Sequence, residues 1–576
     1  MNGKVLRRCG VKKIFSAFWV IVLMFAMFSF SMTIEADYIE KISFENFSDY
    51  RPMTENAAVE EVGEHKVIIS VVLNYEDFDK ESIKKEHPNA FNGKGNDKNI
   101  DDYLKDVRKK GKEHHNKKNK DIDKELKMKD YESKYICEFL PIIEYTYDLE
   151  IYQKNSKQIL KAAAKSERVK EVVVGLTEDL DYDGQVEGAL IHSNALDYYD
   201  NETYTGYNIV VGMLDTGTFD TTLSVFANTD YEVFAQSGSS VTTHATQMAA
   251  ILACNQGIAK ESKLLSAQLI GTPCEEFEWM IGKGVNVINV SLGEQSPTGT
   301  YQTLSAICDY VVRNYDVTIV ASAGNYGETT KFVTNPGLGY NVITVGASDL
   351  YNDYMSLSSY RTSGTPSKPT LVVCGESTDF VDLSSAYSGY GTSVSSAIAT
   401  GMIAMLMESN SQLKTQPERV HTILVANSET LSGYSYTQAN GFDDYVGAGS
   451  FDLQASIRNS TRSTAFTNTY GVSGTMAFSS HITVQAGNTL KVAIAWLANA
   501  DTTASGTTFT KYDLKLEDEN GNVIASTVTH QDNVLMIEYT SQTTKGYYVR
   551  LYQYSSAVDS SETDELCMAY NIRMPE

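Results

Sequence analysis

Between about residues 205 and 455, short runs of Val, Ile and Leu alternate with stretches of helical pattern, and this alternation is the strongest constraint on the fold. The apolar runs are IVVGMLD (209–215), KLLSAQLI (263–270), VNVINVSL (285–292), VTIVASAG (317–324), NVITVGAS (341–348) and LVVC (371–374). Continuous apolar strands separated by helices are typical of a parallel sheet that is covered on both faces. The sequence therefore predicts an α/β domain with a mostly parallel sheet, whose chemistry collects where strand carboxyl ends meet loops.

The helical pattern disappears after residue 458. Strand-like segments such as LKVAIAWLA (490–498) alternate there with turns, and Asn520–Gly521 is a strong hairpin signal. We expect residues 458–576 to form a β-sandwich.

Residues 37–189 have a third pattern. Strands are predicted at 67–73, 135–147 and 169–174 and a helix near 152–164, which together indicate a small α+β domain. Residues 81–130 are roughly half charged, but their 15 basic and 11 acidic side chains nearly cancel. We therefore expect a solvated helix or a disordered insertion there rather than a nucleic-acid site.

An acidic joint, DLDYDGQVEG, occupies residues 179–188. Its alternate Asp residues and Gly184 match the beginning of a calcium loop, but Leu190 stands where a bidentate Glu is needed. A flexible linker is the better interpretation, and structural calcium stays open.

The amino terminus has the order of a secretory signal. Five basic residues between 4 and 13 precede the apolar run 14–30, and polarity returns before Ala36. We expect a signal peptide at 1–36 and a secreted protein. The alternative is an uncleaved anchor, because the run approaches the roughly 18 residues that can span a membrane.

Charge and cysteine content narrow the functional classes. The net charge is −25, and residues 191–576 hold 17 basic and 38 acidic side chains. This acidic region offers no basic surface that could bind a phosphate backbone, so we expect no nucleic-acid partner. The seven cysteines show no metal-binding spacing, and small buried thiols are the preferred interpretation.

Four polar residues of the α/β section follow strands or open helices. Asp215 ends an apolar run, His244 opens a helix-like segment, Asn325 follows another strand, and Ser393 lies at a Gly-Thr helix entrance. Each has an ordinary structural explanation by itself, such as a loop cap or a helix cap. His421 lies in the middle of a helical pattern, and a structural role is expected for it.

The order Asp, His, Asn, Ser resembles that of the subtilisin-like serine peptidases, the subtilases. The resemblance covers roughly residues 205–455. It extends to Thr205–Ile209, the lead-in to the Asp, to Ser291–Gly293, and to Lys368–Pro369 ahead of the serine segment.

The resemblance implies a role for each residue. Asp215 would orient His244, His244 would take the proton from Ser393, and Asn325 would donate to the oxyanion. An extended peptide or protein substrate would pair with a strand edge. The implied substrate-binding residues are Ser291, Leu292, Gly293, Ala323 and Gly324.

The resemblance also explains the flanking regions. Residues 37–189 would be a propeptide that inhibits the enzyme of residues 190–457 and is cut off by it between about 175 and 207. No cofactor is required for the chemistry.

The chain departs from the family pattern beside the His and the Ser. Ala245 replaces the usual Gly, and Val394, Ser395 and Ala397 replace the usual residues after the serine. The segment 244–258 is too short for the calcium loop that interrupts the His helix in many subtilases. Two alternatives to a secreted serine endopeptidase remain: an inactive subtilase serving as a surface binding protein, and a serine esterase or acyl transferase.

Overall fold

A seven-stranded parallel sheet forms the centre of the molecule. This computed structural model describes residues 42–43, 50–52, 66–74, 78–91, 97–118, 122–131, 133–176, 190, 193–234, 238–270, 273–349, 352–362, 366–375, 390–436, 441–469, 473–499, 510–527, 532–555 and 563–574. The strand order is β14-β13-β12-β10-β7-β9-β8, and every pairing is parallel. The strands are β7 (Val210–Asp215), β8 (Asp230–Val233), β9 (Lys263–Gln268), β10 (Val287–Val290), β12 (Thr318–Ser322), β13 (Ile343–Ser348) and β14 (Leu371–Cys374).

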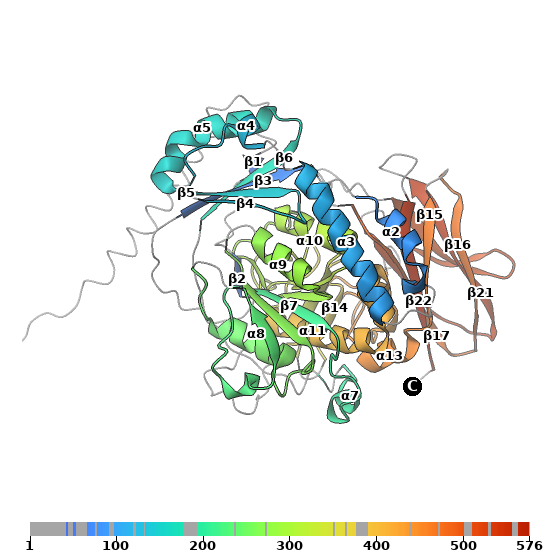
Figure 1. The fold of residues 1–576 in the computed structure, drawn as a ribbon. Coiled ribbons are helices and arrows are strands. Elements are labelled where there is room, and N and C mark those ends of the chain that lie inside the picture. Colours follow the sequence, from blue (N-terminus) through green and yellow to red (C-terminus); the bar gives the residue numbers. More distant parts are fainter. Residues whose placement is uncertain are drawn as a thin grey trace, which may run out of the picture.

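Helices cover both faces of this sheet (Figure 1). One apolar cluster joins the sheet to α8, α11 and α12, and a second joins its other face to α9 and α10. The helices of this domain are α7 (Leu196–Asp200), α8 (Thr243–Ala253), α9 (Cys274–Lys283), α10 (Thr303–Tyr315), α11 (Thr392–Ser409), α12 (Pro417–Asn427) and α13 (Leu453–Asn459), with 3-10 turns η4 (Ser224–Phe226) and η6 (Ser411–Thr415). The predicted α/β fold class is confirmed, because fully buried Val and Ile strands need cover on both sides.

The amino-terminal unit is a five-stranded sheet with order β1-β6-β3-β5-β4. One apolar cluster joins this sheet to α4 and α5, and residues 137–142 belong to the cluster of α9 and α10. Its elements are β1 (Ile42–Ser43), β3 (Lys66–Leu73), β4 (Ser133–Ile136), β5 (Ile142–Asp148), α5 (Leu149–Lys165) and β6 (Val169–Leu176).

The charged segment 81–130 differs from its prediction. It forms α2 (Lys80–Glu86), η3 (Pro88–Ala90), α3 (Asp97–Lys118) and α4 (Ile122–Leu126). Ile100, Tyr103, Leu104 and Val107 of α3 are buried in the cluster of α9 and α10. The expectation of a solvated or disordered insertion is wrong for the buried face of α3. Four apolar residues recur there at helical spacing between the charges.

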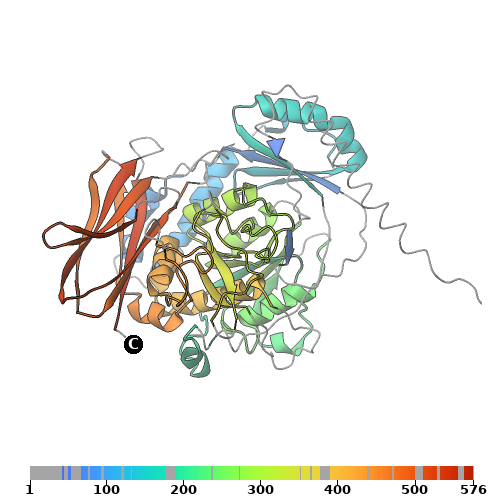
Figure 2. The same cartoon turned by 180° about the vertical axis from the view of Figure 1, so that it is seen from behind.

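Two four-stranded antiparallel sheets, β15-β22-β17-β20 and β16-β21-β18-β19, form the carboxy-terminal β-sandwich. The strands are β15 (Ser463–Thr469), β16 (Met476–Val484), β17 (Thr489–Trp496), β18 (Lys511–Asp518), β19 (Val523–Thr527), β20 (Val534–Thr540), β21 (Lys545–Ser555) and β22 (Thr563–Arg573). The turn at Asn520–Gly521 joins β18 to β19, as predicted. Figure 2 shows from behind that the sandwich and the amino-terminal sheet lie against different sides of the α/β domain.

The six cysteines from Cys137 to Cys567 are buried thiols in the structure. Within the described residues, no helix is long and apolar enough to cross a membrane. The apolar run 14–30 and the acidic joint 179–188 lie outside those residues.

Candidate active site

Asp215 and His244 form a buried hydrogen-bonded pair at the carboxyl end of β7. His244 Nδ1 lies 2.7 Å from Asp215 Oδ1, and both side chains are fully buried. The same carboxylate oxygen accepts the backbone N–H of Thr216 at 2.7 Å, which fixes its orientation. His244 is the second residue of α8, which Thr242 caps by accepting the N–H of Ala245. The pair therefore holds the imidazole with Nε2 directed away from Asp215.

Ser393 is the second residue of α11, the helix that packs against β10 and β12. Its hydroxyl donates to the Ser291 carbonyl at 2.9 Å. Ser291 Oγ in turn donates to the Ser393 carbonyl at 3.0 Å. His244 Nε2 is buried and has no hydrogen-bond partner among the described residues. In the resting structure the serine hydroxyl is thus held by the strand end, and the imidazole nitrogen stays available as a base.

Asn325 follows β12 and reaches the beginning of α11. Its Oδ1 accepts from the Thr392 backbone N–H at 3.1 Å and from Thr392 Oγ1 at 2.9 Å. Its Nδ2 is buried and has no partner in the part of the chain that the structure describes. Because the amide oxygen is fixed by the residue before Ser393, the amide N–H groups remain as buried, unused donors next to the serine.

The edge predicted to bind substrate is the strand β11 (Leu292–Glu294). It pairs in antiparallel register with β2 (Tyr50–Pro52), with Gly293 opposite Arg51. A segment of the chain's own amino-terminal region therefore lies on this edge.

Ala323 and Gly324 lie in the loop between β12 and Asn325. The Ala323 N–H donates to Val345, and the Gly324 N–H donates to Thr392 Oγ1 at 3.1 Å. A β-carbon on Gly324, whose φ is +103°, would come within 2.7 Å of Thr334. The backbone of these two residues is tied within the domain, and the absence of a side chain lets Gly324 fit against Thr334.

The sequence pattern gave no role to Thr392 or Glu294. Thr392 positions the Asn325 amide, and its place between Gly391 and Ser393 was the available signal. Glu294 ends β11, accepts from the Asn335 backbone N–H at 2.6 Å, and is buried. Burial raises the pKa of Glu294 to about 7. This carboxyl ties the end of β11, the strand predicted to bind substrate, to Asn335.

The departures from the family pattern lie in the core. Ala245, Val394 and Ala397 are buried members of the apolar cluster that joins α8 to α11. They contribute packing between the helix of His244 and the helix of Ser393. His421 lies on α12, where burial, with a smaller effect of Lys368, holds its pKa well below the usual range.

The described residues contain no group of three or more His, Cys, Asp and Glu side chains that could hold a metal ion. Structural calcium elsewhere stays a prediction.

Comparison with known proteins shows what the α/β domain is similar to. Residues 206–449 match the model of the subtilase family, which is a peptidase family. Residues 206–449 are therefore a subtilase-like domain. Subtilisin BL from Lederbergia lenta is 25% identical over 257 residues, which are 42% of this chain and 90% of the relative. The minor extracellular protease Vpr of Bacillus subtilis is 26% identical over 232 residues, which are 34% of this chain and 28% of that protein.

Among solved structures, the prenylagaramide maturation protease PagA covers 46% of this chain, at 21% identity and a TM-score of 0.38, and 97% of PagA is covered. The family match and the curated relatives make this chain a serine peptidase.

Proposed function

We propose that this subtilase is a secreted serine endopeptidase that hydrolyses peptide bonds with Ser393 as the nucleophile. The observation that carries the proposal is a buried Asp215–His244 pair on a helix that packs against α11, combined with an unused Asn325 amide that is held at Thr392, the residue before Ser393. A binding protein would not require an oriented imidazole and a preorganised amide donor at the same serine.

The chemistry proceeds in two acyl-transfer steps. Rotation of the Ser393 side chain moves its hydroxyl from the Ser291 carbonyl to His244 Nε2, which takes the proton as Oγ attacks the peptide carbonyl. Asp215 stabilises the imidazolium that results. Asn325 Nδ2 donates to the tetrahedral oxyanion, and His244 then returns the proton to the leaving amine. Water hydrolyses the acyl-enzyme by the same steps.

The amino-terminal region is the proposed intramolecular inhibitor. Its support is the pairing of β2 with β11, because an extended peptide on that edge blocks a substrate that would pair there. The blocking segment, Tyr50–Pro52, precedes the α+β unit in the chain. Replacing Arg51 by Pro removes the N–H of the central residue of the pairing.

A fluorophosphonate probe tests the catalytic proposal. We expect the probe to label wild-type chain at Ser393, to fail on Ser393→Ala, and to label the Arg51→Pro precursor faster than the wild-type precursor. A folded wild-type chain that the probe never labels would instead support the inactive binding protein. A chain that turns over soluble esters but not casein would support the esterase.

A further inference from the structure

Glu294 is a buried carboxylate at the end of the strand predicted to bind substrate. It is the last residue of β11, directly after Gly293. Its two oxygens accept from Asn335, one from the backbone N–H at 2.6 Å and the other from Nδ2 at 3.1 Å. The carboxylate is therefore fixed between β11 and the segment 334–335.

Thr334 connects this carboxylate to the loop that precedes the proposed oxyanion donor. The Thr334 N–H donates to the Ala323 carbonyl at 3.0 Å, and Gly324 lies against the Thr334 side chain. The strand β11 and the loop 323–324 are thus joined through Thr334 and its neighbour, with Glu294 at the junction. A substrate side chain that points between the strand and the loop meets this carboxylate.

The carboxylate of Glu294 has no cationic partner. Among the described residues, no Lys, Arg or His forms an ion pair with it, and its donors are the neutral groups of Asn335. Asn335 is in turn held by neutral groups, Ser305 Oγ at 2.6 Å and the Gln302 N–H at 3.1 Å. Burial raises the pKa of Glu294 to about 7, because only hydrogen bonds oppose the loss of water. A buried carboxylate without a counter-ion is costly, so a cation bound beside it is favoured.

The length of β11 favours a long cationic side chain. Ser291 precedes the strand and contacts the nucleophile residue, because its Oγ donates to the Ser393 carbonyl at 3.0 Å. The substrate residue whose carbonyl is attacked therefore lies beside the beginning of the strand. At about 3.3 Å per residue, Glu294 lies about 10 Å further along. Lys and Arg are the cationic side chains long enough to cover most of that distance, and the Glu294 side chain covers the rest.

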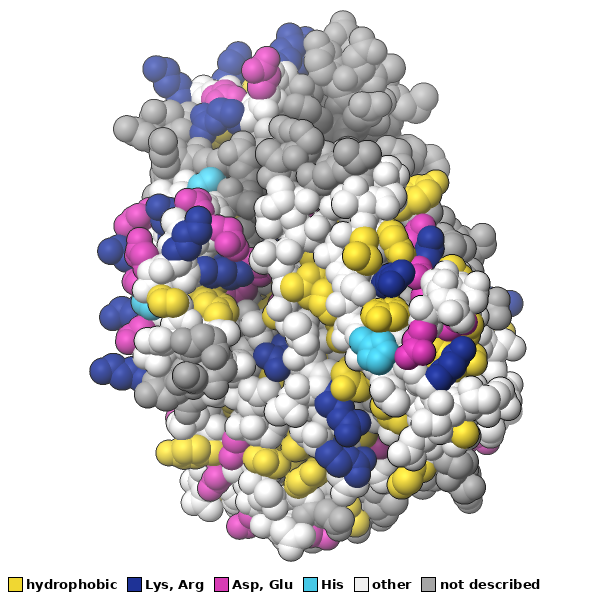
Figure 3. Space-filling view, turned by 90° about the vertical axis from the view of Figure 1, so that its right-hand side faces the viewer, with side chains coloured by type: hydrophobic (Ala, Val, Ile, Leu, Met, Phe, Trp, Pro, Cys, Tyr) yellow, Lys and Arg dark blue, Asp and Glu magenta, His cyan; other side chains and the backbone are white. Residues whose placement is uncertain are grey.

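Surface charge alone would give a different kind of selectivity. Residues 191–576 hold 17 basic and 38 acidic side chains, and such an excess attracts cationic peptides whatever the position of their charge. Figure 3 shows positive and negative side chains mixed over the face of the molecule that carries the sandwich. One fixed and buried carboxylate instead acts on a single position of the peptide, where salt screens it little.

We propose that Glu294 makes this subtilase-like domain select peptides with Lys or Arg as the residue whose carbonyl Ser393 attacks. The cationic end of that side chain pairs with the Glu294 carboxylate, and its apolar stem lies between β11 and Gly324. The inference rests on the proposed function, since it names the peptides that the proposed endopeptidase cuts.

Matched peptide substrates test the proposal on the processed wild-type chain. The peptides share one sequence and carry Arg, its neutral analogue citrulline, or Leu at the cleaved residue. We expect kcat/KM to be about 100-fold higher for Arg than for citrulline, because loss of one partner of a buried charge pair is costly. Glu294→Gln should bring these two values together. Glu328→Gln is the control, because Glu328 is an exposed carboxylate three residues after Asn325, and we expect it to keep the wild-type ratio.

A purely structural role of Glu294 predicts a different result. Glu294→Gln would then lower kcat/KM for all three peptides alike and leave the ratio of Arg to citrulline unchanged. That result, or equal values for Arg and citrulline in the wild-type chain, would overturn the proposal.

A binding measurement separates this proposal from the proposed function. Ser393→Ala combined with Arg51→Pro removes the nucleophile and the central N–H of the segment that lies on β11. Fluorescence anisotropy of labelled peptides then gives dissociation constants without catalysis. We expect the Arg peptide to bind about 10-fold or more tightly than the citrulline peptide. Equal binding, or binding of neither peptide, would overturn the proposal, whereas tighter binding of Arg beside a folded wild-type chain that cuts no peptide would support it and contradict the proposed function.

Discussion

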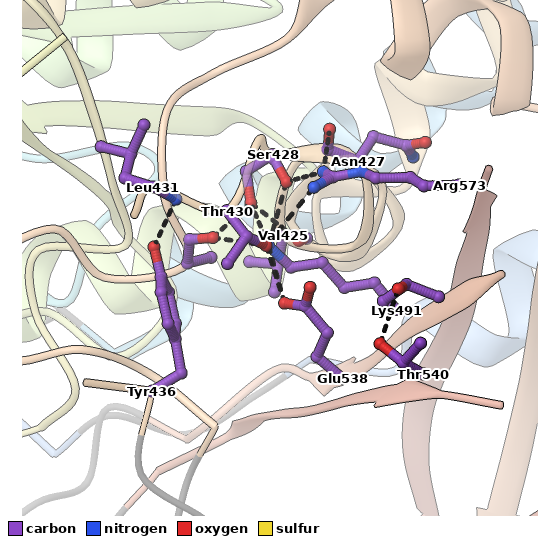
Figure 4. Close-up of polar contacts among 12 residues, drawn as sticks. Val425, Asn427, Ser428, Thr430, Leu431, Tyr436, Lys491, Glu538, Thr540 and Arg573 are labelled. Carbon is purple, nitrogen blue, oxygen red and sulfur yellow. Dashed lines mark hydrogen bonds and ion pairs between the residues drawn. The ribbon is translucent and has the colours of Figure 1, made fainter. Parts of the chain in front are cut away.

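The α/β domain makes two large junctions, and each brings a lysine to the carboxyl end of a helix. At the amino-terminal junction, Lys80 of α2 caps α10. At the sandwich junction, Lys491 of β17 donates to the Ser428 carbonyl at 2.9 Å and to the Ala448 carbonyl at 2.6 Å, beyond the end of α12. Figure 4 shows Lys491 and Arg573 converging on Ser428, with Glu538 nearby.

The two junctions differ in what surrounds the cation. Lys80 and Lys84 are partly exposed and face carboxylates, so water can solvate both partners after separation. Lys491 is fully buried, donates to carbonyl and hydroxyl oxygens and lies 3.9 Å from the Glu538 carboxylate, and burial lowers its pKa to about 7. Arg573 also donates to the Ser428 carbonyl. The lysines of the amino-terminal junction thus keep some contact with solvent, whereas the lysine of the sandwich junction has none.

The largest effect is expected from loss of the catalytic groups, because the amino-terminal unit cannot leave the α/β domain before the backbone between them is cut. His244→Ala and Ser393→Ala should each nearly abolish peptide hydrolysis, and the double variant should be barely worse, because the members of such a site act as a unit. Turnover of a peptide substrate measures this. His421→Ala serves as the control and should keep most of its turnover. A folded, inactive His421→Ala beside an active His244→Ala would show that the base is misassigned.

Asn325→Ala should act through the transition state. Removing one oxyanion donor typically lowers kcat by ~10²–10³ with little change in KM. Steady-state kinetics on one peptide substrate give both constants. Unchanged kcat would remove Asn325 from the mechanism, and a large rise in KM would indicate a role in substrate binding instead.

The sandwich junction should become more stable as pH rises. The pKa of Lys491 is about 7 in the folded chain and 10.5 in an unperturbed lysine. Between these values the unfolded chain binds a proton that the folded chain lacks, so this lysine adds up to about 1.4 kcal/mol of stability per pH unit. Lys491→Met should remove that slope from the free energy of unfolding in urea, measured between pH 7.5 and 9.5. Lys515→Met, on β18 of the other sheet of the sandwich, should keep the wild-type slope. A slope unchanged in Lys491→Met would contradict the assignment.

Gly111→Ala should weaken the amino-terminal junction by about 1–3 kcal/mol, the usual cost of overpacking a tight contact. The added methyl group meets Tyr315, so the free energy of unfolding of the Ser393→Ala chain in urea reports the change. Gly282→Ala is the matched control, because a β-carbon there lies 3.7 Å from Phe139 and has room. Equal free energies of unfolding for the two variants would show that α3 does not pack tightly against α10.

The strands of the α/β domain could be predicted because their apolar runs are continuous. The site residues could be placed near one another because Asp215, Asn325 and Ser393 follow strands or open a helix at one edge. The docking of α3 was missed, although Ile100, Tyr103, Leu104 and Val107 already show helical spacing. Mixed charge dominated the composition of the segment, and composition does not reveal which residues share a face.

Other features of the structure could not be predicted from the residues that surround them in the sequence. The pairing of β2 with β11 joins three residues to a strand more than 200 positions away, and nothing in Tyr-Arg-Pro predicts that partner. The role of Thr392 depends on its distance from Asn325, which the fold sets. The burial of Lys491 likewise results from the docking of two domains, whose relative placement the sequence pattern does not encode.

Amino-terminal sequencing and intact mass of the wild-type chain and Ser393→Ala, expressed without other proteases, test the central claim most directly. The account predicts that wild-type chain yields a form that begins between about residues 175 and 207 and still extends through the sandwich. It predicts that Ser393→Ala stays covalently joined to residues 37–175. Identical processing of the two proteins would contradict self-cleavage by Ser393.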